Sequence, residues 1–281
     1  MYYPFILGKA IAVSLPRRVV YFLAKIIAII HCYTSPGDRE AVEYNLSPLV
    51  EGREVLKKKT RDVFINFAYY LADFFRQSKL SPQFIEKHVE IIGLQHLDRY
   101  LGEGKGVIAL TAHLGNYELG GVVTSMLGYP LSVIALSHRD ERTNIFFDVQ
   151  RRICGLKVIP IGMALKRCIS VLRRGEMLAM LGDRDFSLNK KKFRIFDRYA
   201  YLPRGAAYFA SKTRAHILPS FFIRKGRFDY KLIFEKAITH KINEKFDENE
   251  VIKEYIKVLE RYLKKYPEQW FLFEKYWLLE R

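Results

Sequence analysis

The segment VIALTAHLGNYELGGVV, residues 107–123, carries the clearest fold signal in the chain. It begins with Val107 to Leu110, a short apolar run typical of a buried strand. From Glu118 onward, apolar residues recur with helical spacing, which indicates that a helix follows. His113 therefore falls in the turn that leads from a strand into a helix. Such turns are the usual place for function in an open α/β sheet.

The same turn brings two ionisable residues, His113 and Glu118, close together in sequence. On an ideal helix, residues five positions apart point about 140° away from each other. The two side chains can meet if His113 precedes the helix and Glu118 lies in its first turn. The imidazole could then accept a proton from a hydroxyl near neutral pH, while the carboxylate fixes its tautomer.

An alternative interpretation of the turn is purely structural. His113 would be the N-cap of the helix, and Glu118 a first-turn carboxylate that the helix dipole favours. Spacing alone does not decide between the two interpretations. No G-x-S-x-G motif occurs in the sequence, so direct base catalysis is favoured over a serine acyl-enzyme.

The chain after this turn alternates between strand and helix patterns. We expect strands at 132–136, 157–160 and 177–181, and helices at 141–154, 164–174 and 204–212. Two further strands, at 217–223 and 228–234, could pair at the edge of the sheet, and a basic amphipathic helix follows at 250–265. Strands that alternate with helices form βαβ units. The predicted fold class is α/β, with a largely parallel central sheet flanked by helices.

The first hundred residues are predicted to be mostly helical, because apolar residues recur with helical spacing between positions 55 and 76. The apolar stretch Val19–Tyr33 follows Arg17 and Arg18. It is shorter than the ~20 residues needed to span a bilayer, and no signal-peptide cleavage site follows it. We expect a single domain over 1–281, divided into a helical membrane-anchoring segment (1–35), a helical part (36–100) and the α/β catalytic core (101–281).

The composition indicates an anionic partner. The 281 residues include 47 Lys and Arg against 30 Asp and Glu, which gives a net charge of +17. Such a charge attracts nucleic acid, an anionic membrane surface or an acidic protein. The three cysteines form no C-x-x-C pair, which argues against a disulfide framework or a cysteine zinc site and indicates a reducing compartment.

The segment from Lys190 to Arg198 mixes basic and aromatic residues. The mixture suits an interface with anionic lipid headgroups. It would also suit single-stranded nucleic acid, although no recognised nucleic-acid motif accompanies it. A solvated face is the third interpretation.

Two acidic residues, Asp183 and Asp185, follow the strand predicted at 177–181. Active-site residues collect at the C-terminal ends of parallel strands. Two carboxylates could bind a metal ion, but no histidine or third acid lies nearby in sequence, so no metal site is predicted. Structural ion pairing is the alternative for both residues.

Several motifs, taken in order, resemble a known family. HLGNYE at 113–118 fits the His-x-x-x-x-Asp/Glu motif of the glycerolipid acyltransferase superfamily. Over roughly residues 15–277 the chain resembles, more specifically, the bacterial lipid A biosynthesis (lauroyl/myristoyl) acyltransferase family. The further matches are Arg139 after the next strand, Asp183-Arg184-Asp185, LPRGAAYFASKTRAHILPSFF at 202–222 and YPEQW at 266–270.

This resemblance implies a glycerolipid-acyltransferase-like fold and a set of site residues. His113 would be the general base that deprotonates an acceptor hydroxyl, and Glu118 its orienting partner. Arg139 would stabilise the oxyanion or grip an acceptor phosphate, because a guanidinium suits either task. The alternative for Arg139 is a solvated charge beside Asp140 and Glu141. Asp183, Asp185 and Asn116 would contribute to binding of the substrate or the oxyanion.

The resemblance also implies the substrates and the location. The acyl donor would be an acyl carrier protein or CoA thioester, which is a co-substrate, so no cofactor is expected. The acceptor would be a lipid A precursor or a related glycolipid or phospholipid. The missing Glu-Gly-Thr-Arg motif argues against lysophosphatidic acid. The expected partner surface is the anionic cytoplasmic face of the inner membrane, and no nucleic acid is expected.

Two rival functions stay open at the level of sequence. The chain could be a basic nucleic-acid-binding α/β protein in which His113 and Glu118 only cap a helix. It could also be a lipid or thioester hydrolase, in which water replaces the acceptor hydroxyl.

Overall fold

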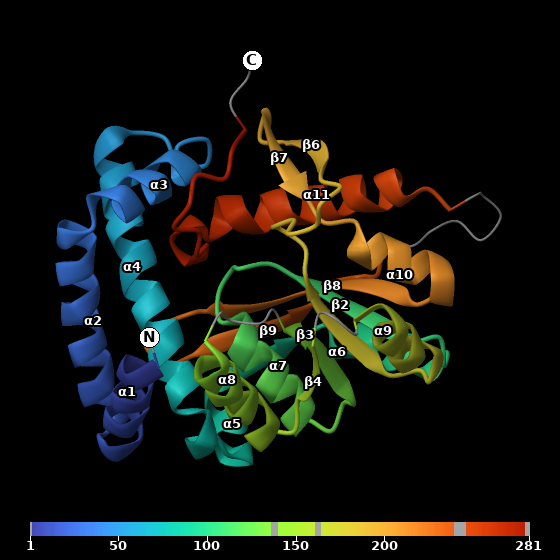
Figure 1. Cartoon of the computed structure of the whole chain (residues 1–281), viewed down its shortest axis with the longest axis horizontal. Coiled ribbons are helices and arrows are strands. Elements are labelled where there is room, and N and C mark those ends of the chain that lie inside the picture. Colours follow the sequence, from blue (N-terminus) through green and yellow to red (C-terminus); the bar gives the residue numbers. More distant parts are fainter. Residues whose placement is uncertain (1, 136–139, 161–163, 239–245, 279–281) are drawn as a thin grey trace.

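A seven-stranded sheet with helices on both faces forms the body of the molecule (Figure 1). The computed structural model describes residues 2–135, 140–160, 164–238 and 246–278. The sheet contains β1 (Val89–Ile92), β2 (Val107–Thr111), β3 (Leu131–Ala135), β4 (Lys157–Pro160), β5 (Met177–Leu181), β8 (His216–Arg224) and β9 (Tyr230–Phe234). A separate hairpin is formed by β6 (Lys191–Ile195) and β7 (Arg198–Leu202).

The helices of the body lie between and after these strands. They are α5 (Pro82–His88), α6 (Leu94–Gly102), α7 (Tyr117–Met126), α8 (Glu141–Ile153), α9 (Ala164–Arg173), α10 (Gly205–Thr213) and α11 (Glu248–Lys265). Four helices precede them: α1 (Tyr2–Ser14), α2 (Arg17–Thr34), α3 (Pro36–Leu46) and α4 (Arg53–Phe75).

The sheet is mostly parallel, with the strand order β1-β9-β8-β2-β5-β3-β4. Strands β8, β2, β5, β3 and β4 run in one direction, whereas β9 is antiparallel to β8 and parallel to β1. The predicted fold class is therefore confirmed. Strands β8 and β9 do pair, but inside the sheet, because β1 occupies the edge that was expected for them.

Strand β2 lies at the centre of the sheet and separates two hydrophobic cores. Val107 and Ala109 pack on one face with α7, while Ile108 and Leu110 pack on the other face with α9, α10 and α11. This alternation follows from the two-residue period of a strand. Because β2 is buried on both faces, the turn after it starts from a rigid position.

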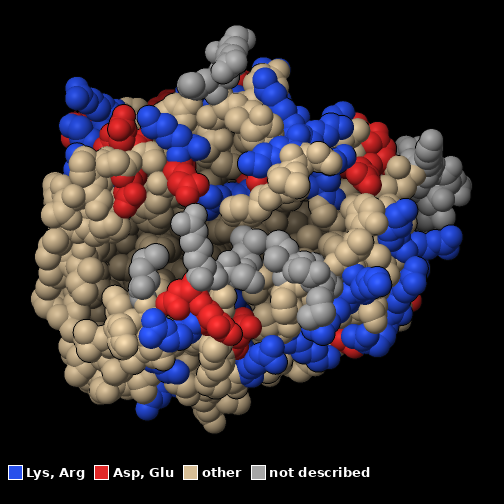
Figure 2. Space-filling view, in the orientation of Figure 1, with Lys and Arg blue, Asp and Glu red and all other residues tan. Residues whose placement is uncertain are grey.

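The N-terminal helices form a layer beside the sheet, and α4 is the helix that joins this layer to the body (Figure 1). The aromatic residues of α4 belong mostly to the hydrophobic core, including Phe64, Phe74 and Phe75. In contrast, α1 and α2 expose many large apolar side chains: Tyr3, Ile6, Leu7, Ile11, Val19, Phe22, Leu23, Ile26, Ile27, Ile30 and Tyr33. Figure 2 shows few charged side chains on the flank formed by α2.

Among the described helices, none alone has the length and apolar composition needed to cross a membrane. The pair α2 and α3 reaches that threshold only when the two are taken together, and it is bent by 93° at the break between them.

Candidate active site

The turn between β2 and α7 has the strand-to-helix form that the sequence predicts. The N-cap of α7 is Asn116, whose side-chain oxygen accepts a hydrogen bond from the backbone N–H of Leu119 at 3.1 Å. His113 lies three residues before this cap. Its imidazole is therefore not used in starting the helix, in contrast to the structural interpretation of the turn.

Three backbone hydrogen bonds hold the turn in place. Gly115 N–H donates to the carbonyl of Gln269, Asn116 N–H donates to Phe222, and the carbonyl of His113 accepts from Phe271, each at 2.8 Å. Gly115 has a φ of +67°, and a Cβ there would lie 2.2 Å from the carbonyl oxygen of Phe222. Only glycine fits this close approach of two backbones.

The His113 side chain is bonded to Asp183, which lies just after β5. Nδ1 of His113 is 2.8 Å from one oxygen of Asp183, and the other oxygen accepts from His113 N–H at 3.0 Å and from Trp270 Nε1 at 3.1 Å. The Asp183 side chain is fully buried. Burial opposes ionisation of this carboxyl, but its electrostatic attraction to His113 and these hydrogen bonds outweigh it, so the pKa of Asp183 is lowered.

This pairing fixes the tautomer of the histidine. An ionised carboxylate can only accept a hydrogen bond, so the proton resides on Nδ1 of His113 and the lone pair on Nε2. No residue in the described parts of the chain hydrogen-bonds Nε2. The edge of the Tyr117 ring packs against the imidazole, with the ring centroids 5.5 Å apart. His113 is therefore held in the geometry of a proton acceptor.

Glu118 has a different partner from the one expected. Its two oxygens accept hydrogen bonds of 2.6 and 3.1 Å from the guanidinium of Arg151 on α8. Both side chains are nearly buried, at 11% and 13% exposure. The carboxylate bonded to His113 is thus Asp183, whereas we expected Glu118 there. The reason is topological: β5 is the parallel neighbour of β2, so their C-terminal ends meet, while Glu118 points from α7 toward α8.

A cavity lies between α7 and the sheet, next to the turn. Its volume is about 760 Å³, which includes open solvent at its mouth. Its polar lining residues include Thr111, Tyr117 and the Glu118–Arg151 pair. Apolar residues of β2, β3, β5 and β9 line the rest, among them Ala109, Leu131, Met177, Ala179 and Phe234. The lining is mostly apolar, and Tyr117, which belongs to it, packs against His113.

The other expected site residues occupy different positions. Asp185 is half-buried and accepts a hydrogen bond from Ser187 N–H, which stabilises the loop after β5. Asn116 is 2% exposed, and its amide group caps α7 and binds Asp73. Arg139 lies outside the described residues. Within the described ranges, no cluster of three or more His, Cys, Asp or Glu could hold a metal ion.

Two contributors to the site were not identified from the sequence. Arg151 lies 33 residues after Glu118, and nothing in its local pattern distinguishes it from other basic residues of a surface helix. Trp270 belongs to the YPEQW motif that the resemblance rests on, but the motif alone does not reveal that its indole binds Asp183.

The sequence model of one protein family, described as Bacterial lipid A biosynthesis acyltransferase, matches residues 2–279. A Lipid A biosynthesis acyltransferase of Haemophilus influenzae is 27% identical over 142 residues, which cover 50% of this chain and 45% of that protein. A Phosphatidylinositol mannoside acyltransferase of Mycobacterium tuberculosis is 23% identical over 58% of this chain and 53% of its own length. A protein of the same name from Mycolicibacterium smegmatis is 22% identical over 65% of this chain and 62% of its own length. The chain spans about half the length of the curated relatives it matches.

Proposed function

The chain belongs to the bacterial lipid A biosynthesis acyltransferase family, and we propose on this basis that it moves a fatty acyl chain from a thioester to a hydroxyl of a glycolipid. The observation that carries this proposal is the His113–Asp183 pair beside an apolar cavity. The proposed donor is an acyl carrier protein or CoA thioester. The proposed acceptor is a lipid A precursor or a related glycolipid or phospholipid.

The proposed reaction uses His113 as a general base. Nε2 takes the proton of the acceptor hydroxyl while the hydroxyl oxygen attacks the thioester carbonyl. The tetrahedral intermediate then collapses, the carbon–sulfur bond breaks, and the imidazolium returns its proton to the departing thiolate. Asp183 stabilises the imidazolium between these two steps, as a buried carboxylate does in hydrolytic triads.

Two further residues have proposed roles at this site. Arg139 is our candidate donor to the oxyanion or to an acceptor phosphate, and preorganised donors of this kind usually give the largest electrostatic contribution to acyl transfer. Asp185, in the loop after β5, is proposed to help position the acceptor.

We propose that the cavity under α7 holds the acyl chain. Its apolar lining suits a hydrocarbon, and Tyr117, which lines it, packs against His113, where the thioester carbonyl must lie. The Glu118–Arg151 pair also lines the cavity and is proposed to form part of its polar rim. In this role Glu118 affects donor binding through Arg151. The alternative role of Glu118, as the orienting partner of His113, requires a rearrangement that breaks its two hydrogen bonds to Arg151.

The acceptor is proposed to be reached from the cytoplasmic face of the inner membrane. The exposed apolar side chains of α1 and α2 form a surface that can enter the interfacial region of a bilayer. The net charge of +17 adds attraction to anionic lipids and to an acidic carrier protein. Residues 1–35 would thus act as the membrane-anchoring segment.

Mass spectrometry of envelope lipids, from cells with and without the protein, tests the proposal. We expect one glycolipid to lose a single acyl chain when the protein is absent, and to regain it with the wild-type protein but not with His113→Ala. An unchanged glycolipid together with altered free fatty acid would favour the hydrolase alternative. Family membership favours acyl transfer over the nucleic-acid-binding alternative.

A further inference from the structure

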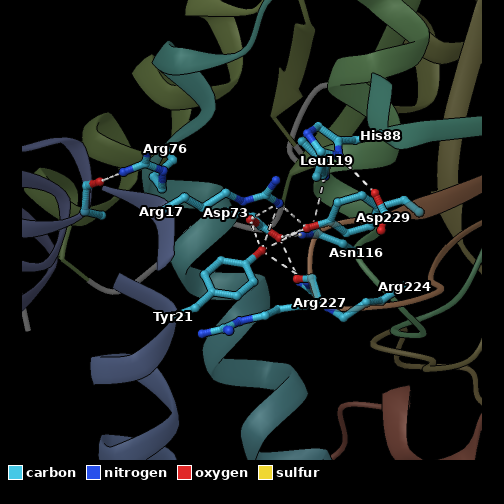
Figure 3. A network of polar contacts seen from close by, with 12 residues as sticks. Arg17, Tyr21, Asp73, Arg76, His88, Asn116, Leu119, Arg224, Arg227 and Asp229 are labelled. Atoms are coloured by element: carbon cyan, nitrogen blue, oxygen red, sulfur yellow. Dashed lines mark hydrogen bonds and ion pairs between the residues drawn. The ribbon is translucent and has the colours of Figure 1, made fainter. Parts of the chain in front are cut away.

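A second buried carboxylate, Asp73 on α4, lies close to the turn but takes no part in the proposed reaction. It is 4% exposed, and five side chains donate hydrogen bonds to its two oxygens (Figure 3). The donors are Arg17 at 3.0 Å, Arg224 at 2.8 Å, Asn116 at 3.1 Å, Tyr21 and Tyr230. We refer to Asp73 and these donors as the Asp73 network.

The Asp73 network joins three parts of the fold that are distant in sequence. Arg17 and Tyr21 come from α2, and Arg224 and Tyr230 from the ends of β8 and β9 that face each other. The fifth donor is Asn116, which starts α7 and stands three residues after His113. One carboxylate thus contacts both the N-terminal helix layer and the turn that carries the proposed base.

Asn116 is the link between this network and the turn. Its Nδ2 donates to Asp73, while its Oδ1 caps α7. Both bonds are buried, so the orientation of the Asn116 amide is fixed from two sides. The backbone N–H of Asn116 is also bonded, to Phe222. A loss of the Asp73 contact would leave the side chain held only by its capping bond, at the point where the turn becomes a helix.

The charges explain why the network is rigid. Burial disfavours an ionised Asp73, but Arg224 and Arg17 outweigh it, and with the hydrogen bonds from Tyr21 and Tyr230 they lower the pKa of Asp73. The guanidiniums stack on the surrounding aromatic rings, with Arg224 4.9 Å from the centroid of Tyr230. A buried charge whose donors are all directional has few alternative arrangements of similar energy.

We propose that Asp73 is a positioning residue, which holds the His113 turn in its reactive geometry as long as α2 is packed on α4. This inference rests on the proposed acyl transfer and adds to it a coupling between the membrane-facing helix and the site. Because Tyr21 and Arg17 bind Asp73 directly, displacement of α2 changes the hydrogen bonds available to Asn116. The exposed face of the same helix is the one proposed to contact the bilayer.

The test compares Tyr21→Phe with Tyr262→Phe. Each substitution removes one hydroxyl that donates to a carboxylate: Tyr21 to Asp73, and Tyr262 on α11 to Glu235 at 2.6 Å. Only the first carboxylate contacts the turn. A second variant, Asn116→Ser, keeps an oxygen that can cap α7 but removes the donor to Asp73. The substrates are myristoyl-acyl carrier protein and a lipid A precursor in mixed micelles, and thermal unfolding is measured for every variant.

We expect Tyr21→Phe to lower kcat about tenfold, since displacing reacting groups by ~1 Å can cost roughly a hundredfold in rate. KM for the donor should stay within about twofold, because the cavity is not altered. Tyr262→Phe should keep the wild-type kcat. In the Asn116→Ser background, Tyr21→Phe should cause little further loss, because both changes interrupt the same link.

Equal kcat values for Tyr21→Phe and Tyr262→Phe would overturn the inference, and so would fully additive losses in the double variant. If Tyr21→Phe fails to fold, Asn116→Ser decides alone: a wild-type kcat for that variant would overturn the inference. Failure of the proposed function gives a different result, in which the wild-type protein transfers no acyl chain or His113→Ala is as active as wild type.

Discussion

Two buried aspartates hold the turn from His113 to Asn116, one at each of these two residues. Asp183, after β5, binds the imidazole of His113. Asp73, on α4, binds two arginines and two tyrosines besides Asn116. Both carboxyls have lowered pKa values. Burial and pKa therefore do not distinguish a chemical role from a structural one, whereas the nature of the partners does.

The partners differ in whether they can exchange a proton during a reaction. Guanidiniums stay charged at all working pH values, so the Asp73 network has a structural role and does not transfer protons. The imidazole facing Asp183 can take up a proton and release it. The following predictions test this division, from the largest expected effect to the smallest.

The largest loss is expected at the proposed base. His113→Ala removes the proton acceptor and should lower kcat on the order of 10² to 10⁴-fold, which is the usual contribution of a general base. The fold should persist with reduced stability, because the side chain belongs to neither hydrophobic core but its loss leaves the buried Asp183 without its partner. Transfer kinetics and thermal unfolding of the purified protein provide the measurement. Activity within a few-fold of wild type would remove His113 from the chemistry.

The second prediction concerns stability at the other aspartate. Asp73→Asn leaves Arg224 buried and Arg17 half-buried beside a neutral amide, which should cost about 3–5 kcal/mol of unfolding free energy. Because the pKa of Asp73 is lowered, its ionised form stabilises the fold above the ordinary pKa of 3.8, and this contribution is lost as pH falls through the folded-state pKa.

Denaturant titrations over a range of pH provide the measurement for Asp73. The stability gap between wild type and Asp73→Asn should be constant from about pH 5 to 8 and narrow below about pH 4. Asp183 is present in both proteins, so its own titration cancels in the difference. A gap that widens toward acid pH would contradict the charge network.

The third prediction extends the comparison to the outer side of the helix layer. Leu7→Glu places a charge on the exposed apolar face of α1 and should weaken flotation with anionic vesicles several-fold. Leu165→Glu is the matched control, since Leu165 is similarly exposed but lies on α9, at 53% against 63% for Leu7. Equal flotation of the two variants would show that α1 does not contact lipid.

The smallest effect is expected where neither aspartate is involved. Lys190, Lys191 and Lys192 lie at the β6–β7 hairpin, and their replacement by alanine should slow donor capture on the order of threefold at low salt. The loss should fade as salt rises, because the Debye length is about 8 Å at physiological ionic strength. Transfer rates at subsaturating acyl carrier protein measure it. A loss that is independent of salt would exclude electrostatic docking through this cluster.

The elements around the site could be predicted because their patterns are local. The strands at 157–160 and 177–181 agree with β4 and β5 to the residue, and His113 lies in the predicted turn. Strand β1 was missed, because it follows α5 directly with no glycine or proline between them.

The pairings within the site could not be predicted, because they depend on which strands are neighbours. β2 and β5 are adjacent although β3 and β4 lie between them in sequence, and only this adjacency brings Asp183 to His113. No sequence motif distinguishes Asp73, since a single acidic residue in a helix rich in aromatic residues is not unusual. Its importance comes from donors between 43 and 157 residues away.

In the proposed mechanism, Asp183 and not Glu118 is the carboxylate that orients His113 and stabilises its imidazolium. The most direct test is kcat at saturating donor and acceptor for Asp183→Asn and Glu118→Gln, with thermal unfolding as the control for folding. We expect Asp183→Asn to lose on the order of 10² to 10⁴-fold in kcat. Glu118→Gln should keep kcat within about threefold and raise KM for the acyl donor, as expected for a residue that contributes only to binding. A larger loss of kcat for Glu118→Gln than for Asp183→Asn would contradict this mechanism and make Glu118 the carboxylate that orients His113.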